Sequence, residues 1–156
     1  MTRTEQVNRR LGGLGDIGKF IAALWRSRHS GGAVTPNSDA TKIDIAAVAA
    51  MVDGVDVPVG VGVAETAVVL TGYTPTIVTT STQFMKVLVT VKKAGTHGIY
   101  SGAKVASQAL AVKPAVPAAE CEIAYLEIPN SFTAGTTSVT AGMCKQASAV
   151  DGLGIF

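Results

Sequence analysis

The chain has 156 residues, which is enough for one domain with a buried core, and 47% of them are hydrophobic. Aromatic residues make up only 5% and charged residues only 15%, so Ala, Val, Gly and Thr fill the difference. An isolated soluble monomer normally carries more charge. The composition therefore argues against an isolated monomer and favours a chain whose surface is largely covered by neighbouring subunits.

Charge is distributed unevenly along the chain. Residues 1–28 contain six Arg or Lys side chains and two acidic ones, whereas the remainder contains seven Lys and nine acidic side chains. The sequence therefore predicts a mildly acidic body with a basic N-terminal arm. The arm is either a solvated end or a segment that docks on an acidic partner surface, and we favour docking. Nucleic acid is not expected as a partner, because the arm lacks the interleaved aromatic residues of single-strand binders.

The arm carries an apolar stripe at helical spacing, and its members are Val7, Leu11, Leu14, Ile17, Ile21 and Leu24. Four glycines between positions 12 and 18 each disfavour a helix by about 1 kcal/mol, so the sequence predicts a helix only over 16–28. The stripe packs either on the chain's own β-body or on another subunit, and we favour another subunit. The candidate interface residues are Arg9, Arg10, Leu11, Leu14, Ile17, Phe20, Ile21, Leu24, Trp25 and Arg26.

A loop-like composition at 29–41, rich in Gly, Pro, Asn, Ser and Asp, supplies the one credible boundary. The predicted organisation is an arm at 1–30, a linker at 31–41 and a β-domain at 42–156. Apolar residues recur at every second position from residue 42 onward, which is typical of strands. In the first run, one face is expected to hold Ile43, Ile45, Ala47, Ala49 and Met51.

Asp53 and Gly54 predict a hairpin turn after this run. Valine alternates with other residues over 55–63, and Pro58 places that strand at a sheet edge or in a bulge, since it cannot donate a ladder hydrogen bond. In the strand at 84–92, the valines are expected to point inward, and Lys86, Thr90 and Lys92 toward solvent. Further strand-like segments lie at 67–71, 76–80, 97–100, 104–112, 122–128 and 137–140, and after 143.

About seven to nine short strands separated by turn signals indicate an all-β fold, either a compact sandwich or a barrel-like domain. Strand order is not visible in the sequence, so both architectures stay open. No βαβ alternation and no repeat of fixed period are present. The predicted molecule is therefore one β-domain with an N-terminal arm that contains a short helix.

The sequence offers no pattern of catalytic residues, so we expect a protein that is not an enzyme. His29 and His97 are the only histidines, and neither has a nearby nucleophile or acid in a catalytic spacing. The letters G-x-G-x-x-G occur at 13–18 but without the preceding strand of a dinucleotide site. Cys121 and Cys144 are too few for a zinc site and are expected to be free thiols. No cofactor, no metal, no secretory signal and no membrane span are expected.

From about residue 41 onward, the order of several segments resembles that of structural proteins in tailed-bacteriophage virions. The segments are V-D-G at 52–54, A-G-T at 94–96, P-A-V-P-A at 114–118, A-Y-L-E-I at 124–128 and F-T-A-G-T-T-S-V at 132–139. Each segment alone is common, and it is their order that carries the resemblance. The N-terminal arm is not part of it.

The resemblance implies a non-enzymatic virion protein, similar to the small β-rich decoration or cement proteins that stabilise phage heads. Its implied partners are the major capsid protein or another virion protein, together with further copies of itself, and a trimer is favoured. It would be made in the host cytoplasm and located in the virion. A tail- or fibre-associated adaptor and a host-surface-binding β-domain are the alternatives that the same segments leave open.

Overall fold

The computed structural model describes residues 26–40, 42–52, 55–58 and 65–147, which form an all-β domain, as expected. Its strands in chain order are β1 (Arg26–Gly31), β2 (Val34–Pro36), β3 (Lys42–Ile45), β4 (Val48–Val52), β5 (Val55–Pro58), β6 (Glu65–Val69), β7 (Met85–Lys92), β8 (His97–Ser101), β9 (Glu120–Ile128) and β10 (Cys144–Gln146). Two single-turn 3-10 helices, η1 (Gln108–Leu110) and η2 (Ala141–Met143), precede β9 and β10.

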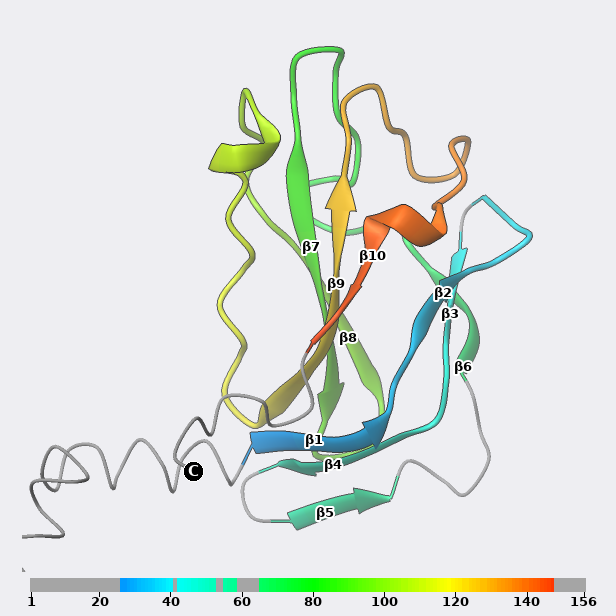
Figure 1. The fold of residues 1–156 in the computed structure, drawn as a ribbon, viewed down its shortest axis with the longest axis vertical. Coiled ribbons are helices and arrows are strands. Elements are labelled where there is room, and N and C mark those ends of the chain that lie inside the picture. Colours follow the sequence, from blue (N-terminus) through cyan, green and yellow to red (C-terminus); the bar gives the residue numbers. More distant parts are fainter. Residues whose placement is uncertain (1–25, 41, 53–54, 59–64, 148–156) are drawn as a thin grey trace, which may run out of the picture.

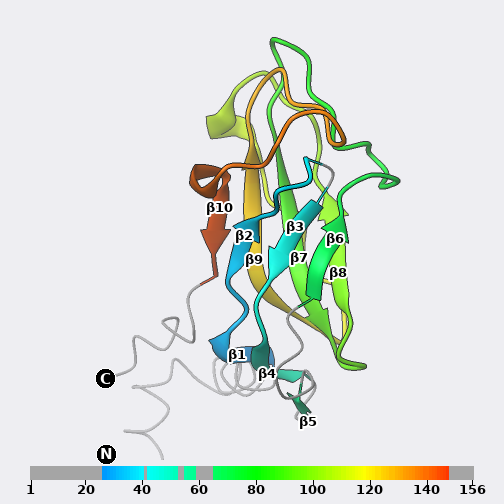
Figure 2. The ribbon, with the colours of Figure 1, turned by 90° about the vertical axis from the view of Figure 1, so that its right-hand side faces the viewer.

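Two antiparallel sheets face each other across the core (Figures 1 and 2). One has the strand order β10-β9-β7-β8 and the other has the order β2-β3-β6. A third group, β1-β4-β5, lies across one end of this sandwich (Figure 1). The core between the sheets consists mainly of aliphatic side chains, and its fully buried members include Ile43, Ile45, Leu70, Met85, Leu126, Ile128 and Phe132.

A bent two-stranded ribbon joins the third group to the sandwich. β1 leads into β2, and β3 leads into β4. The pairing continues through the bend by hydrogen bonds from Gly32 N to Ala47 O (2.9 Å) and from Ala46 N to Ala33 O (2.9 Å). Gly31 and Gly32 have φ angles of 71° and 69°, which Gly adopts without the steric cost that a side chain brings. The bend therefore directs the ribbon from the β2-β3-β6 sheet to the β1-β4-β5 group at the end of the sandwich.

The same bend explains an error in the predicted face of residues 43–51. Ile43 and Ile45 are buried as expected, but the expectation for Ala47, Ala49 and Met51 is wrong, since the two alanines are exposed and Met51 is only half-buried. Two consecutive residues occupy the bend, so the inward positions shift by one along the strand. Beyond the bend, the buried side chains are those of Val48, Ala50 and Val52.

Residues 26–31 form a strand and not the end of a helix. β1 pairs antiparallel with β4, with Arg26 opposite Val52 and Gly31 opposite Val48. The predicted helix is therefore wrong over 26–28, because pairing with a neighbouring strand outweighs the weak helical preference there. Residues 16–25 lie outside the described part. β2 likewise falls in the predicted linker, so the sandwich includes strands that precede residue 42.

Several later elements agree with the sequence pattern. β7, β8 and β9 lie where it predicts strands, and the β7–β8 hairpin turns at 94–96. β5 contains Pro58 and is an edge strand, as predicted. Cys121 and Cys144 are free thiols. The strands expected over 76–80, 104–112 and 137–140 do not form, and the first of these segments contributes only an isolated bridge between Val78 and Thr133.

The outer face of the four-stranded sheet is covered, although the sequence pattern indicates solvent there. Leu88 and Thr90 alternate with the core residues of β7 and are fully buried, so the prediction for Thr90 is wrong. Residues 102–119, which connect β8 to β9, run beside this sheet (Figure 1). They approach it closely at Gly102, whose N–H donates to Lys86 O (2.8 Å), and they contribute the buried Ala111.

Charged side chains on this outer face pair with one another. Lys86 lies 3.5 Å from Glu127, and Lys113 of the covering segment forms an ion pair with Glu122. The ammonium groups of Lys86 and Lys113 also lie 5.3 Å and 5.6 Å from the centroid of the Tyr125 ring. Partly exposed pairs of this kind contribute up to about 1 kcal/mol each, and Lys113 ties the covering segment to the sheet.

Candidate binding groove at the β8 edge

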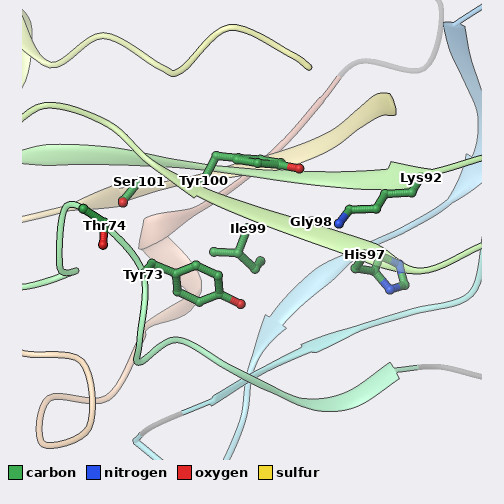
Figure 3. Close-up of a pocket in the computed structure, with 8 residues that line it drawn as sticks. All are labelled: Tyr73, Thr74, Lys92, His97, Gly98, Ile99, Tyr100 and Ser101. Carbon is green, nitrogen blue, oxygen red and sulfur yellow. The ribbon is translucent and has the colours of Figure 1, made fainter. Parts of the chain in front are cut away.

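A groove of about 430 Å³ lies along β8, which is an edge strand of the four-stranded sheet. Figure 3 shows the side chains of Tyr73 and Ile99 on one side of β8 and that of Tyr100 on the other. Lys92 lies at the end of the groove near the β7–β8 turn, and Ser101 lies toward the other end (Figure 3). The lining residues are Tyr73, Thr74, Lys92, His97, Gly98, Ile99, Tyr100 and Ser101.

The hydrogen-bond register of the hairpin determines which backbone groups of β8 face the groove. Antiparallel pairs alternate between bonded and non-bonded. The bonds from Gly102 N to Lys86 O and from Lys92 N to Thr96 O, both 2.8 Å, fix the bonded positions at each end of β8. Counting inward by two residues, 98 and 100 bond to β7, whereas the N–H and C=O groups of Ile99 and Ser101 point away from it.

A buried carboxylate lies beside the groove. Glu120, the first residue of β9, is only 7% exposed, and it accepts hydrogen bonds from the hydroxyl groups of Tyr100 (2.6 Å) and Thr90. Burial of an isolated carboxylate is costly, and these two donors offset the lost hydration. The three residues come from β9, β8 and β7, so the network fastens the edge strand to the two strands behind it.

Gly98 makes room for this network. A Cβ atom at position 98 would lie 2.5 Å from Thr90 Oγ1, 2.8 Å from Tyr100 Cε2 and 2.9 Å from Glu120 Oε2. All three distances are shorter than ordinary van der Waals contacts. Glycine in a strand interior often marks a close approach of this kind, and here the approaching groups are the carboxylate and its two hydroxyl donors.

The environment of Tyr100 keeps its hydroxyl protonated. Burial, the hydrogen bond to Glu120 and the negative charge of that carboxylate together raise the pKa of Tyr100 from 10.0 to about 12. The Tyr100 hydroxyl is therefore a hydrogen-bond donor at neutral pH and not a base. The arrangement favours a binding edge that is held rigidly in place.

Comparisons with protein families, curated proteins and solved structures found no match. Within the described ranges, no helix is long and apolar enough to cross a bilayer. In the same part of the chain, no three side chains of His, Cys, Asp or Glu are gathered as metal ligands would be. The geometry of the described residues is therefore the guide to what the body binds.

The predicted interface residues of the arm are not brought together by the described structure. Arg26 begins β1, and residues 1–25, which include the glycine-rich letters at 13–18, lie outside the described part. The other nine lie in that stretch: Arg9, Arg10, Leu11, Leu14, Ile17, Phe20, Ile21, Leu24 and Trp25. Their role as an interface stays a prediction.

Sequence reasoning alone does not reveal the groove or its carboxylate network. The sequence places His97 in a turn or strand, and it is the first residue of β8. Gly98 is the one available signal, because a glycine inside a predicted strand indicates a close approach by another group. The partners that approach it, Thr90 and Glu120, come from other strands, and only the fold identifies them.

Proposed function

We propose that this chain is a non-enzymatic structural protein of a tailed-phage virion, and specifically a decoration protein that stabilises the head by binding across capsid subunits. The proposal is supported by the sequence segments whose order along the chain resembles that of such proteins. Four of them lie wholly within the described sandwich: the β7–β8 turn, the segment covering the outer sheet face, the second half of β9, and the loop that contains Phe132. They are therefore parts of one folded body.

The observation that carries the proposal is a pair of uncharged loops at one end of the sandwich, with Lys104 beside them donating from its Nζ to Thr76 Oγ1 (3.3 Å). The two loops are 70–84 and 129–143, and neither contains an Asp, Glu, Lys or Arg. Most of their residues have exposed or half-buried hydroxyl, amide or small apolar side chains. The cores of protein–protein interfaces are depleted in charge, whereas free surfaces carry it, so we assign this end to a subunit contact.

The two loops are held together rigidly. Thr79 N donates to Phe132 O (2.8 Å), and Phe132 N donates to Thr79 Oγ1 (3.0 Å), with the Phe132 ring fully buried. Asn130 Nδ2 donates to Ser81 O (2.9 Å) at the tip. A surface that is ordered before binding loses less conformational entropy on association, which suits an additive stabiliser of a shell.

The major capsid protein is the proposed partner of this end, and the basic arm that precedes β1 would add a second contact. Quantitative mass spectrometry of purified particles tests the assignment. A copy number comparable with that of the major capsid protein supports a decoration protein. A copy number comparable with that of tail proteins moves the chain to the tail-adaptor alternative, and absence from the particles refutes a virion role.

A binding experiment tests the two uncharged loops directly. Heads from a phage that lacks the gene would be mixed with the purified chain and sedimented. Ser81→Glu combined with Ser138→Glu places two charges on the exposed loops, and this variant should fail to co-sediment. Thr96→Glu places a charge on the exposed β7–β8 turn and is the matched control. Binding by the loop variant as strong as that of the control would refute this end as the contact.

A further inference from the structure

We infer that the β8 edge binds an extended, acidic segment of another polypeptide, which adds to the four-stranded sheet as a further strand. This inference rests on the groove at β8 and does not depend on the virion assignment. Its elements are an edge with unsatisfied pairing capacity, a preformed groove beside it, and positive charge at one end.

The two edges of the four-stranded sheet are treated differently by the fold. At the β10 edge, the side-chain amide of Gln146 accepts from Val34 N (3.2 Å) and donates to Val34 O (3.0 Å). This amide acts as a substitute strand and joins β10 to β2 of the opposite sheet. At the β8 edge, Ser101 Oγ donates to Pro75 O, but no backbone hydrogen bond from the described residues reaches the outward groups of Ile99.

An unpaired edge is a template for another strand, and proteins that do not use such an edge usually protect it. Strand addition takes its affinity from main-chain hydrogen bonds and its specificity from alternate side chains. The groove at β8 provides both, since Ile99 and Ser101 present outward N–H and C=O groups and the Tyr73 ring forms a wall beside them (Figure 3). The hydrogen bonds of Tyr100 and Thr90 to Glu120 hold β8 in position for pairing with a partner strand.

The charge near the groove indicates the chemistry of the partner. Lys92 lines the groove, and its neighbour Lys93 is exposed. Within the described residues, neither lysine forms an ion pair with a carboxylate. Glu120, the cross-strand neighbour of Lys92, is buried and already accepts two hydroxyl hydrogen bonds. A segment with an acidic side chain at the end beside Lys92 therefore complements this edge.

Selection from a library of short random peptides against the immobilised full chain tests the inference and requires no assumption about the partner's identity. Bound peptides should be enriched in β-branched residues and in Asp or Glu near one end. The best of them should slow amide hydrogen exchange at Ile99 and Ser101 in the isotope-labelled full chain. N-methylation of every second peptide nitrogen should abolish binding when it falls on one alternate set of positions and not on the other, because a paired strand uses every second N–H.

A matched pair of variants tests the charge complementarity. Lys92→Glu should weaken binding of the selected acidic peptide by about five- to tenfold, because it replaces a partly exposed attraction by a repulsion, whereas Lys42→Glu, in the opposite sheet, should leave its affinity unchanged. Equal effects of the two variants would overturn the inference. So would failure to select any peptide, selected peptides without acidic bias, unprotected amides at positions 99 and 101, or light scattering showing that a second copy occupies the edge.

Discussion

Replacing Gly98 by Ala tests the carboxylate network beside the groove. In an ordinary strand this change is favourable by about 0.5–1 kcal/mol, because Gly loses more backbone entropy on folding than Ala. Here the added methyl group would meet Thr90 Oγ1 at 2.5 Å, Tyr100 Cε2 at 2.8 Å and Glu120 Oε2 at 2.9 Å. Each of these groups can withdraw only by lengthening or breaking the hydrogen bonds that join them.

The magnitude of the effect follows from two contributions. Overpacking a well-filled site costs typically about 1–3 kcal/mol, and loss of a hydrogen bond to a charged group costs about 1.5–3 kcal/mol. The two costs do not add in full, because side chains that move apart to relieve the overpacking do so by weakening the hydrogen bonds. We therefore expect Gly98→Ala to lower the free energy of unfolding by about 2–3 kcal/mol in total. The sign is opposite to the one that strand propensity predicts.

Urea denaturation followed by far-UV circular dichroism measures this free energy, with an unchanged dependence on urea indicating that the folded and unfolded states stay comparable. Gly142→Ala is the matched control, because a Cβ atom there would meet only Thr140 Oγ1, at 3.9 Å. The control should lie within about 0.5 kcal/mol of the parent. A Gly98→Ala variant as stable as the control, or more stable than the parent, would refute the packing that we describe.

Two further predictions concern the same sheet. The raised pKa of Tyr100 means that the folded state holds its phenolic proton more tightly than the unfolded state; this stabilisation is complete below pH 10.0 and is lost as pH rises toward about 12. Urea titrations across this window should show a loss of about 1–2 kcal/mol after allowance for solvent exposure, and a loss of equal size in Tyr100→Phe would contradict the assignment. Gln146→Ala should lower stability by about 1–2 kcal/mol and speed amide exchange at Val34, and exchange at the parent's rate would show that the amide does not fasten β10 to β2.

The sequence pattern is sufficient to locate strands that run without interruption. β7 and β9 lie at the predicted positions, and the glycine-containing turn at 94–96 separates β7 from β8 as expected. The Asp53–Gly54 signal also agrees with a β4–β5 hairpin in which Val52 pairs with Val55. In these elements, local alternation and turn chemistry determine the structure, and both can be read from neighbouring residues.

The pattern fails where a distant segment decides the environment. Thr90 occupies the outward side of its strand, but it is fully buried and its hydroxyl donates to Glu120, which comes from another strand. The bend at Ala46 and Ala47 shifts the inward positions of β4. Two consecutive alanines do not predict a bend, and the glycines that permit it lie on the opposite strand of the ribbon. The groove at β8 likewise depends on the loop containing Tyr73, which sequence reasoning places near no particular strand.

The clasp between Gln146 and Val34 has a consequence for synthesis of the protein in the cell. Its partners are separated by 112 residues, and β10 cannot pair with β9 or reach β2 until Gln146 has left the ribosome. A nascent chain therefore carries β2 with an open edge for most of the interval before β10 is made, and β9 for a shorter interval, although the β1–β4 ribbon and the β7–β8 hairpin can already form. Closure of this fold consequently waits for β10. The long loop that must close slows this step, and until then the open edges are exposed to pairing between chains on the same polysome.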